Sequence, residues 1–147
     1  MNPFKRPESI LVVVYTRAGR VLMLRRRDPP EFWQSVTGSL DWEESAVAAA
    51  ARELKEETGL EVGEGLRDLG IVNRFPIIEP WRRRYAPDVK ENTEYVFSLA
   101  LPGESAIKVS PAEHAESLWL DWRAAAEKAT SWTNREAILA VAKLENW

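Results

Sequence analysis

Three glutamates at helical spacing, Glu53, Glu56 and Glu57, are the residues of this sequence best suited to chemistry. They lie in a segment, Ala46 to Thr58, that is rich in strong helix formers, so we expect a helix there. Because residues three and four apart share a helix face, the three carboxylates would crowd together and repel one another. A hard cation such as Mg²⁺, with Mn²⁺ as the alternative, prefers oxygen ligands and would reverse that repulsion. The spacing therefore predicts a divalent-metal site, in which Glu56 or Glu57 can also take a proton from water.

The residues that flank these glutamates fit the same interpretation. Arg52 lies between acidic positions and can orient a neighbouring glutamate by a charge-assisted hydrogen bond. Gly38 precedes an acidic loop, where a glycine permits either a close backbone approach or a positive φ. Ser45 is the expected N-cap of the helix, and Gly59 stands where a left-handed residue often ends one. Alone, the fragment E-x-x-E-E is more typical of a solvated helix face than of a metal site.

From residue 38 to residue 60 the sequence reads GSLDWEESAVAAAARELKEETGL. It matches G-x5-E-x7-R-E-U-x-E-E-x-G-U, where U is aliphatic, at every specified position, including Gly38 and Glu44. This pattern resembles the signature of the Nudix hydrolases, which cut nucleoside diphosphates linked to another moiety with a divalent metal. The resemblance implies an α/β fold, an α/β/α sandwich with a mixed β-sheet. The catalytic positions that it implies are Arg52, Glu53, Glu56 and Glu57.

Segments over almost the whole chain resemble one bacterial Nudix subgroup, which releases pyrophosphate from 7,8-dihydroneopterin triphosphate in folate synthesis. They are KRPESILVVVY, LRRRDPPEFWQSVTGSLDWEE, RRRYAPDVKENTEYVFSLALP, AEHAESLWLD and SWTNREAI. The resemblance implies a further metal ligand at Glu113. The substrate contacts that it implies are Lys5, Arg26, Thr37, Arg82 and Ser131. A pyrophosphohydrolase of dATP and, in another class, a non-catalytic ligand sensor stay open as alternatives, and capping of the last helix stays open for Ser131.

Length and composition exclude several other classes of protein. A chain of 147 residues predicts a single domain over residues 1–147. The formal net charge of −3 argues against a general nucleic-acid binder, and the absence of cysteine excludes thiol chemistry. No stretch approaches the length of a membrane span and no signal peptide is evident. We therefore expect a cytoplasmic protein that acts on a small-molecule triphosphate, while its oligomeric state stays open.

The remaining elements must hold these residues around one site. Ile10–Tyr15 and Val21–Leu24 are continuous apolar runs, typical of strands that are covered on both faces. The other expected strands are Trp33–Val36, Leu66–Phe75, Thr93–Leu101 and Ser117–Leu120. Two further helices are expected over Asp121–Ala129 and Asn134–Leu144, the latter with an apolar face of Ala137, Ile138, Val141 and Leu144.

Two arginine clusters are the candidates for phosphate binding. One is residues 25–27, after the second strand, and the other is residues 82–84, in an expected loop over residues 76–91. Since alternate strand residues face opposite ways, only Arg26, or else Arg25 with Arg27, can face the site. Trp42 is a candidate for the pocket mouth. For His114, the only histidine, a packing or surface role is favoured over catalysis.

Overall fold

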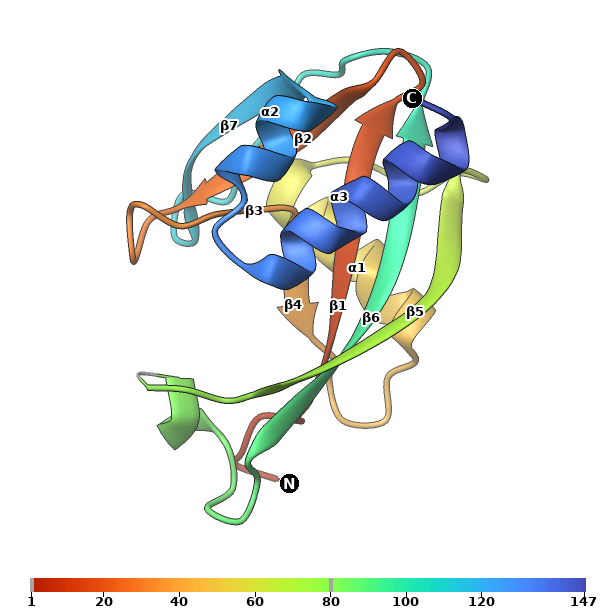
Figure 1. Ribbon diagram of the computed structural model, residues 1–147. Coiled ribbons are helices and arrows are strands. Elements are labelled where there is room, and N and C mark those ends of the chain that lie inside the picture. Colours follow the sequence, from red (N-terminus) through yellow and green to blue (C-terminus); the bar gives the residue numbers. More distant parts are fainter. Residues whose placement is uncertain (1, 80) are drawn as a thin grey trace.

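Strand β1 (Glu8–Thr16) lies in the middle of a seven-stranded mixed sheet, because its aliphatic run can be covered on both faces. The computed structural model describes residues 2–79 and 81–147 (Figure 1). Strand β1 pairs in parallel with β6 (Glu91–Leu101) and antiparallel with β2 (Arg20–Arg26) and β4 (Val36–Ser39). The order along the sheet is β3 (Trp33–Gln34), β2, β1, β6 and β5 (Leu66–Pro76), and β7 (His114–Asp121) pairs with β2.

Helices cover both faces of this sheet and give it two separate cores. Side chains of β1 alternate between them, so Ile10 and its neighbours two apart pack under α1 (Ala46–Thr58). Leu11 and its neighbours two apart pack under α2 (Trp122–Lys128) and α3 (Trp132–Glu145), as Figure 1 shows. The predicted α/β/α sandwich with a mixed sheet is thereby confirmed.

Helix α1 has the predicted bounds and the predicted caps. The Ser45 hydroxyl accepts a hydrogen bond from the Ala48 backbone N–H at 3.2 Å, and Gly59 has φ 77°, in the left-handed region. Ala49 and Ala50 are buried against the sheet, and such small side chains let the helix backbone lie close to β1. This close approach brings the acidic face of α1 to the sheet edge formed by β4.

Two expectations about the elements were wrong in detail. The strand expected over residues 33–36 is two strands, because the chain breaks at Ser35 and passes from pairing with β2 to pairing with β1. The Ser35 backbone N–H donates instead to Asn134 Oδ1 at 2.7 Å. On α3, Leu144 is 49% exposed although the spacing placed it on the apolar face, and Ala142 is buried near that end.

The expected loop over residues 76–91 contains a short 3-10 helix, η1 (Trp81–Arg84), and it includes residue 80, which lies outside the described residues. This segment projects away from the two cores at the lower end of β5 and β6 (Figure 1). Among the described residues, no helix combines the length and apolarity that crossing a membrane would require.

Candidate active site

Arg52 on α1 ties the acidic loop to the helix. Its guanidinium donates to both carboxylate oxygens of Glu44, at 2.8 and 2.9 Å, and to the backbone carbonyl of Ser39 at 3.0 Å. The third guanidinium nitrogen, Nη1, donates to Glu53 Oε1 at 2.8 Å. The hydrogen bond from Arg52 holds the pKa of Glu44 below its ordinary value. One planar side chain therefore fixes both the loop and the orientation of a neighbouring glutamate.

Gly38 on β4 lies directly against the Glu53 carboxyl group. A Cβ atom at this position would stand 2.2 Å from Glu53 Cδ and 2.4 Å from Oε1, far inside van der Waals contact. Gly38 has no positive φ, so the close approach, rather than an unusual backbone conformation, is what requires a glycine.

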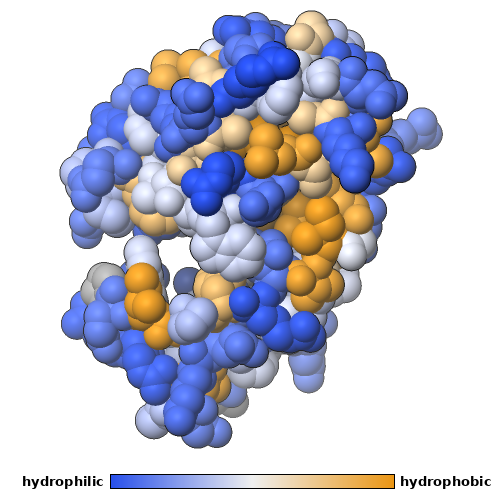
Figure 2. Space-filling view, in the orientation of Figure 1, coloured by the Kyte–Doolittle hydropathy of each residue, from blue (hydrophilic) through white to orange (hydrophobic). Residues whose placement is uncertain are grey.

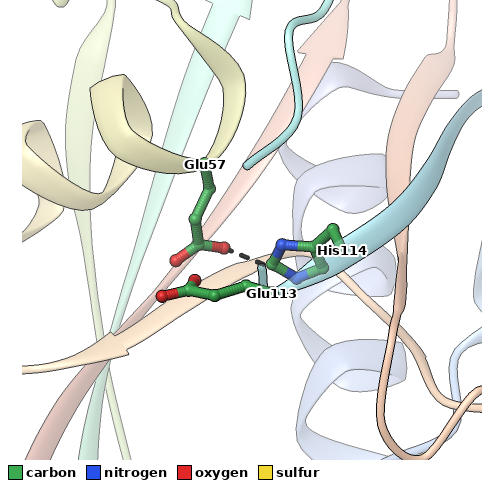
Figure 3. A group of neighbouring side chains, drawn as sticks. All are labelled: Glu57, Glu113 and His114. Atoms are coloured by element: carbon green, nitrogen blue, oxygen red, sulfur yellow. Dashed lines mark ion pairs between the residues drawn. The ribbon is translucent and has the colours of Figure 1, made fainter. Parts of the chain in front are cut away.

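Glu57 meets Glu113 and His114 where α1 approaches the start of β7 (Figure 3). One ligand atom from each of the three residues lies within 4.8 Å of the other two. Glu57 is 1% exposed, and its carboxylate oxygens make no hydrogen bond of standard geometry among the described residues, although the Glu53 carboxyl group and the Thr37 backbone lie close to them. Burial raises the pKa of Glu57 well above its ordinary value, and the nearby Glu53 and Glu113 raise it further. A buried acid is costly to ionise on its own, and a cation bound at this cluster would favour its charged form.

His114 is buried beside Glu57, and its imidazole is neutral at neutral pH. Burial, together with the positive charge of Arg26, lowers the pKa of His114 to about 4. Its Nε2 atom lies 3.8 Å from Glu57 Oε1, too far for a hydrogen bond, and 3.2 Å from Gln34 Nε2. Because an amide nitrogen only donates, His114 Nε2 accepts from Gln34. The 3.8 Å approach to Glu57 is therefore not an ion pair.

The donor set fits a hard divalent cation. Two carboxylates and an imidazole converge in the cluster, Glu53 lies close enough to raise the pKa of Glu57, and the two Glu57 oxygens are free to coordinate. Carboxylate oxygens are the ligands of Mg²⁺ and Mn²⁺ in proteins. Glu56 is placed differently, since its side chain is 54% exposed and its Oε2 lies 3.4 Å from Arg52 Nη1.

A large open cavity, of about 1120 Å³, begins at these acids and extends across the end of the sheet. Figure 2 shows the molecule hollowed between its main body and the lower part that carries η1. Glu53 and Glu113 contribute to its wall, as does Trp42, which is 47% exposed. Of the other residues predicted for the site, the cavity is lined by Lys5, Arg26, Thr37, Gly38, Arg52 and Ser131.

In the first arginine cluster, Arg26 is the member that lines the cavity. Its guanidinium lies about 6 Å from the rings of Phe32 and Trp81. Arg25 pairs instead with Glu116 at 2.7 Å, and Arg27 donates to the Pro111 carbonyl. Strand alternation allowed either Arg26 alone or Arg25 with Arg27 to face the site, and in the structure it is Arg26.

In the second cluster, Arg84 lines the cavity and Arg82 does not. The Arg82 guanidinium donates to the backbone carbonyls of Val89, at 2.8 Å, and Pro87, at 3.3 Å, and so holds its own loop together. Arg84 was not singled out from the sequence, because three successive arginines in a 3-10 turn point in different directions. Lys5 lies nearby: its pKa is lowered, first by burial and then by the charges of Arg84 and Arg26.

Ser131 caps α3 and also lines the cavity. Its hydroxyl oxygen accepts from the Asn134 backbone N–H at 3.2 Å and from Asn134 Nδ2 at 2.7 Å. The cavity is also lined by five buried polar residues that sequence reasoning missed, although polar residues at alternate positions of a strand are a usable signal. They are Gln34, Asn92, Glu94, Thr133 and Asn134.

Comparison with known proteins adds the following similarities. A family model described as the NUDIX domain matches residues 5–141. The chain is 51% identical over 139 residues to dihydroneopterin triphosphate diphosphatase of Escherichia coli strain K12, covering 92% of this chain and 91% of that protein. It is 38% identical over 142 residues to the protein of the same name from Haemophilus influenzae, covering 94% and 89%. The solved E. coli dihydroneopterin triphosphate pyrophosphohydrolase matches with a TM-score of 0.85 at 50% identity, covering 93% of this chain and 95% of that one.

Proposed function

Because this chain belongs to the Nudix family, we propose that it is a metal-dependent pyrophosphohydrolase of 7,8-dihydroneopterin triphosphate. Water adds to phosphorus, the bond between the first and second phosphates breaks, and the products are the monophosphate and pyrophosphate. Attack on either phosphorus beside that bond gives the same products. The observation that carries the proposal is the buried Glu57 carboxyl group, which lies beside Glu53 and Glu113 at the edge of a large cavity.

Mg²⁺ is the proposed cation, with Mn²⁺ as the alternative, because the available ligands are mainly carboxylate oxygens. When bound, a divalent cation withdraws charge from phosphoryl oxygens and lowers the pKa of a water molecule. Glu53, Glu57 and Glu113 are proposed to hold it. Glu56 stays in the proposed set because it lies one helical turn beyond Glu53 and its exposed side chain can turn away from Arg52.

The chain's own residues then bind and orient the substrate. Lys5, Arg26 and Arg84 place positive charge along the cavity, where a triphosphate needs counter-charge. Thr37 lines the same cavity, and its hydroxyl group can donate a hydrogen bond to a phosphate oxygen. Glu56 or Glu57 takes the proton from the attacking water, and Arg52 keeps Glu53 in position throughout.

The deciding measurement compares kcat/KM for dihydroneopterin triphosphate and for dATP in Mg²⁺, with separate assays for pyrophosphate and orthophosphate. Preference for the pterin with release of pyrophosphate is the expected result. Equal or better use of dATP would make the protein a pyrophosphohydrolase of the nucleotide pool. Turnover of neither substrate would refute the enzyme and favour a ligand sensor.

A Glu56→Gln variant separates catalysis from binding. We expect turnover to fall by about 10²–10⁴-fold, the range for a positioned general base, while substrate binding persists. Glu64→Gln is the matched control, because Glu64 is an exposed glutamate of the loop that follows α1. Unchanged turnover in Glu56→Gln would remove Glu56 from the catalytic set.

A further inference from the structure

The wall of the cavity formed by β6 and α3 carries buried polar groups that the hydrolytic chemistry does not use. Asn92 and Glu94 on β6 are each 4% exposed, and Thr133 and Asn134 on α3 are 4% and 3% exposed. Further along, the same face of β6 continues with the buried Val96 and packs in the apolar core under α3. Buried polar groups cost free energy unless they find partners, so a polar ligand at this wall would satisfy those that the protein leaves unpaired.

Glu94 has unused capacity to accept hydrogen bonds. Asn73 Nδ2 donates to Glu94 Oε1 at 3.3 Å, and the Thr133 hydroxyl also bonds to this carboxyl group. A carboxylate offers about four acceptor positions, so about two remain for a ligand in the cavity that Glu94 lines. Asn92 adds to this character, because its Nδ2 donates to Ser9 Oγ at 2.8 Å while its buried Oδ1 has no partner among the described residues.

Because this wall offers hydrogen-bond acceptors, it can bind a ligand edge that carries N–H donors. A carboxylate pairs best with two adjacent N–H donors, as a guanidinium fork shows. The 2-amino-4-oxo edge of a pterin offers such a pair, from its 2-amino group and N3–H. The corresponding edge of adenine offers one donor, the 6-amino group, beside one acceptor, N1, whose lone pair a carboxylate repels.

We propose that Glu94 is the residue that selects the pterin ring, by accepting hydrogen bonds from its 2-amino group and N3–H. This assignment rests on the proposed function and names the part of the cavity that recognises the heterocycle. Both Glu94 and the acids Glu53 and Glu113 line the one cavity, so a single ligand can place its ring at β6 and its phosphates at α1. Phe32 and the half-exposed Trp132 supply apolar surface within the same cavity.

The first test uses the unaltered protein and rings without phosphate. Pterin and lumazine have the same bicyclic ring, but lumazine carries a carbonyl oxygen where pterin has the 2-amino group. Their dissociation constants would be measured by titration calorimetry in EDTA, so that binding does not depend on the metal site. We expect pterin to bind about tenfold or more tightly, the effect of losing one hydrogen bond to a charged group. Equal affinities, or no binding of either ring at millimolar concentration, would overturn the assignment.

The second test reverses the pattern of donors and acceptors. In Glu94→Gln, the amide presents one donor and one acceptor, which match the lumazine C2 carbonyl and N3–H but not the two donors of pterin. We expect the preference for pterin over lumazine to fall by about tenfold or more, and kcat/KM for dihydroneopterin triphosphate to fall relative to dATP. Glu91→Gln, at an exposed position of the same strand, is the control and should keep both ratios.

Failure of this assignment differs from failure of the proposed function. Normal turnover of dihydroneopterin triphosphate with unchanged ratios in Glu94→Gln would refute the role of Glu94 alone. No turnover by the unaltered protein, with pterin still preferred over lumazine in EDTA, would refute the hydrolase and support the ring-binding site. If Glu94→Gln fails to fold, the comparison of the two rings on the unaltered protein still decides.

Discussion

Replacing Glu57 by glutamine should make the metal-free protein more stable, although it removes a proposed catalytic group. Glu57 is 1% exposed, and its two oxygens make no hydrogen bond of standard geometry among the described residues. A glutamine keeps the shape, carries no charge, and its amide N–H can donate to the nearby carboxylates of Glu53 or Glu113. Relief of one unsatisfied buried group is worth about 1–3 kcal/mol. For a chain of this size that corresponds to a rise of about 2–12 °C in Tm.

The sign of the pH dependence follows from the raised pKa of Glu57. The folded state holds a proton on Glu57 at pH values where the unfolded chain has released it, so folding is coupled to proton uptake. The stability of the metal-free wild type should therefore fall as pH rises from the ordinary pKa of a glutamate through the raised folded value. Glu57→Gln should lack that decline. The variant should therefore exceed the wild type in free energy of unfolding by more at pH 8 than at pH 5.

Mg²⁺ should reverse the order of stability, so that the wild type becomes more stable than Glu57→Gln. A cation at 100 times its dissociation constant stabilises the folded wild type by about 2.7 kcal/mol, or about 5–11 °C, while the variant should gain little. Thermal unfolding in EDTA and in saturating MgCl₂ measures both effects, with Glu127→Gln, at an exposed position of α2, as the control. A Glu57→Gln protein that is less stable than wild type in EDTA would refute the reasoning, since the carboxyl group would then have a stabilising partner.

Three further substitutions test the geometry around the site. Gly38→Ala would press a methyl group against Glu53, so we expect a loss of about 1–3 kcal/mol in denaturant unfolding and a marked fall in kcat/KM; Gly63→Ala, which has open space, should change neither. Arg52→Lys replaces a fork by a point charge, and kcat/KM should fall about tenfold or more, whereas full activity would show that the fork is dispensable. Ser131→Ala should cost about 1 kcal/mol in urea unfolding, as for a lost N-cap. A raised KM in that variant without loss of stability would instead identify a substrate contact.

Glu43, in the acidic loop before α1, has an unusual backbone conformation. Glu43 has φ 70°, a left-handed conformation that side chains other than glycine adopt at a cost. Two contacts stabilise this conformation. The Asp41 backbone N–H donates to Glu44 Oε1 at 2.9 Å, and the Arg52 guanidinium on α1 donates to the same carboxylate. The Trp42 indole N–H donates to the Phe4 carbonyl at 2.8 Å, which ties the loop to the chain segment before β1.

The sequence alone determined the features that arise within one element. The bounds and caps of α1 follow from helix propensity, Ser45 and Gly59, because each acts on its own few residues. The shared face of Glu53 and Glu57 follows from helical periodicity. The continuous apolar runs likewise predicted buried central strands, and the pattern from Gly38 to Leu60 identified the family.

Tertiary structure decided which of these parts meet. Glu113 lies beside Glu57 because β7 pairs with β2 and thereby starts next to the end of α1, and no local pattern encodes that pairing. In the same way, Arg82 binds carbonyls of its own loop, and Arg84 is the arginine of η1 that lines the cavity. The packing of α3 over β6 likewise places Thr133 beside Glu94. Neighbours within a helix or strand are fixed by its period, whereas neighbours across elements depend on strand pairing and side-chain packing throughout the fold.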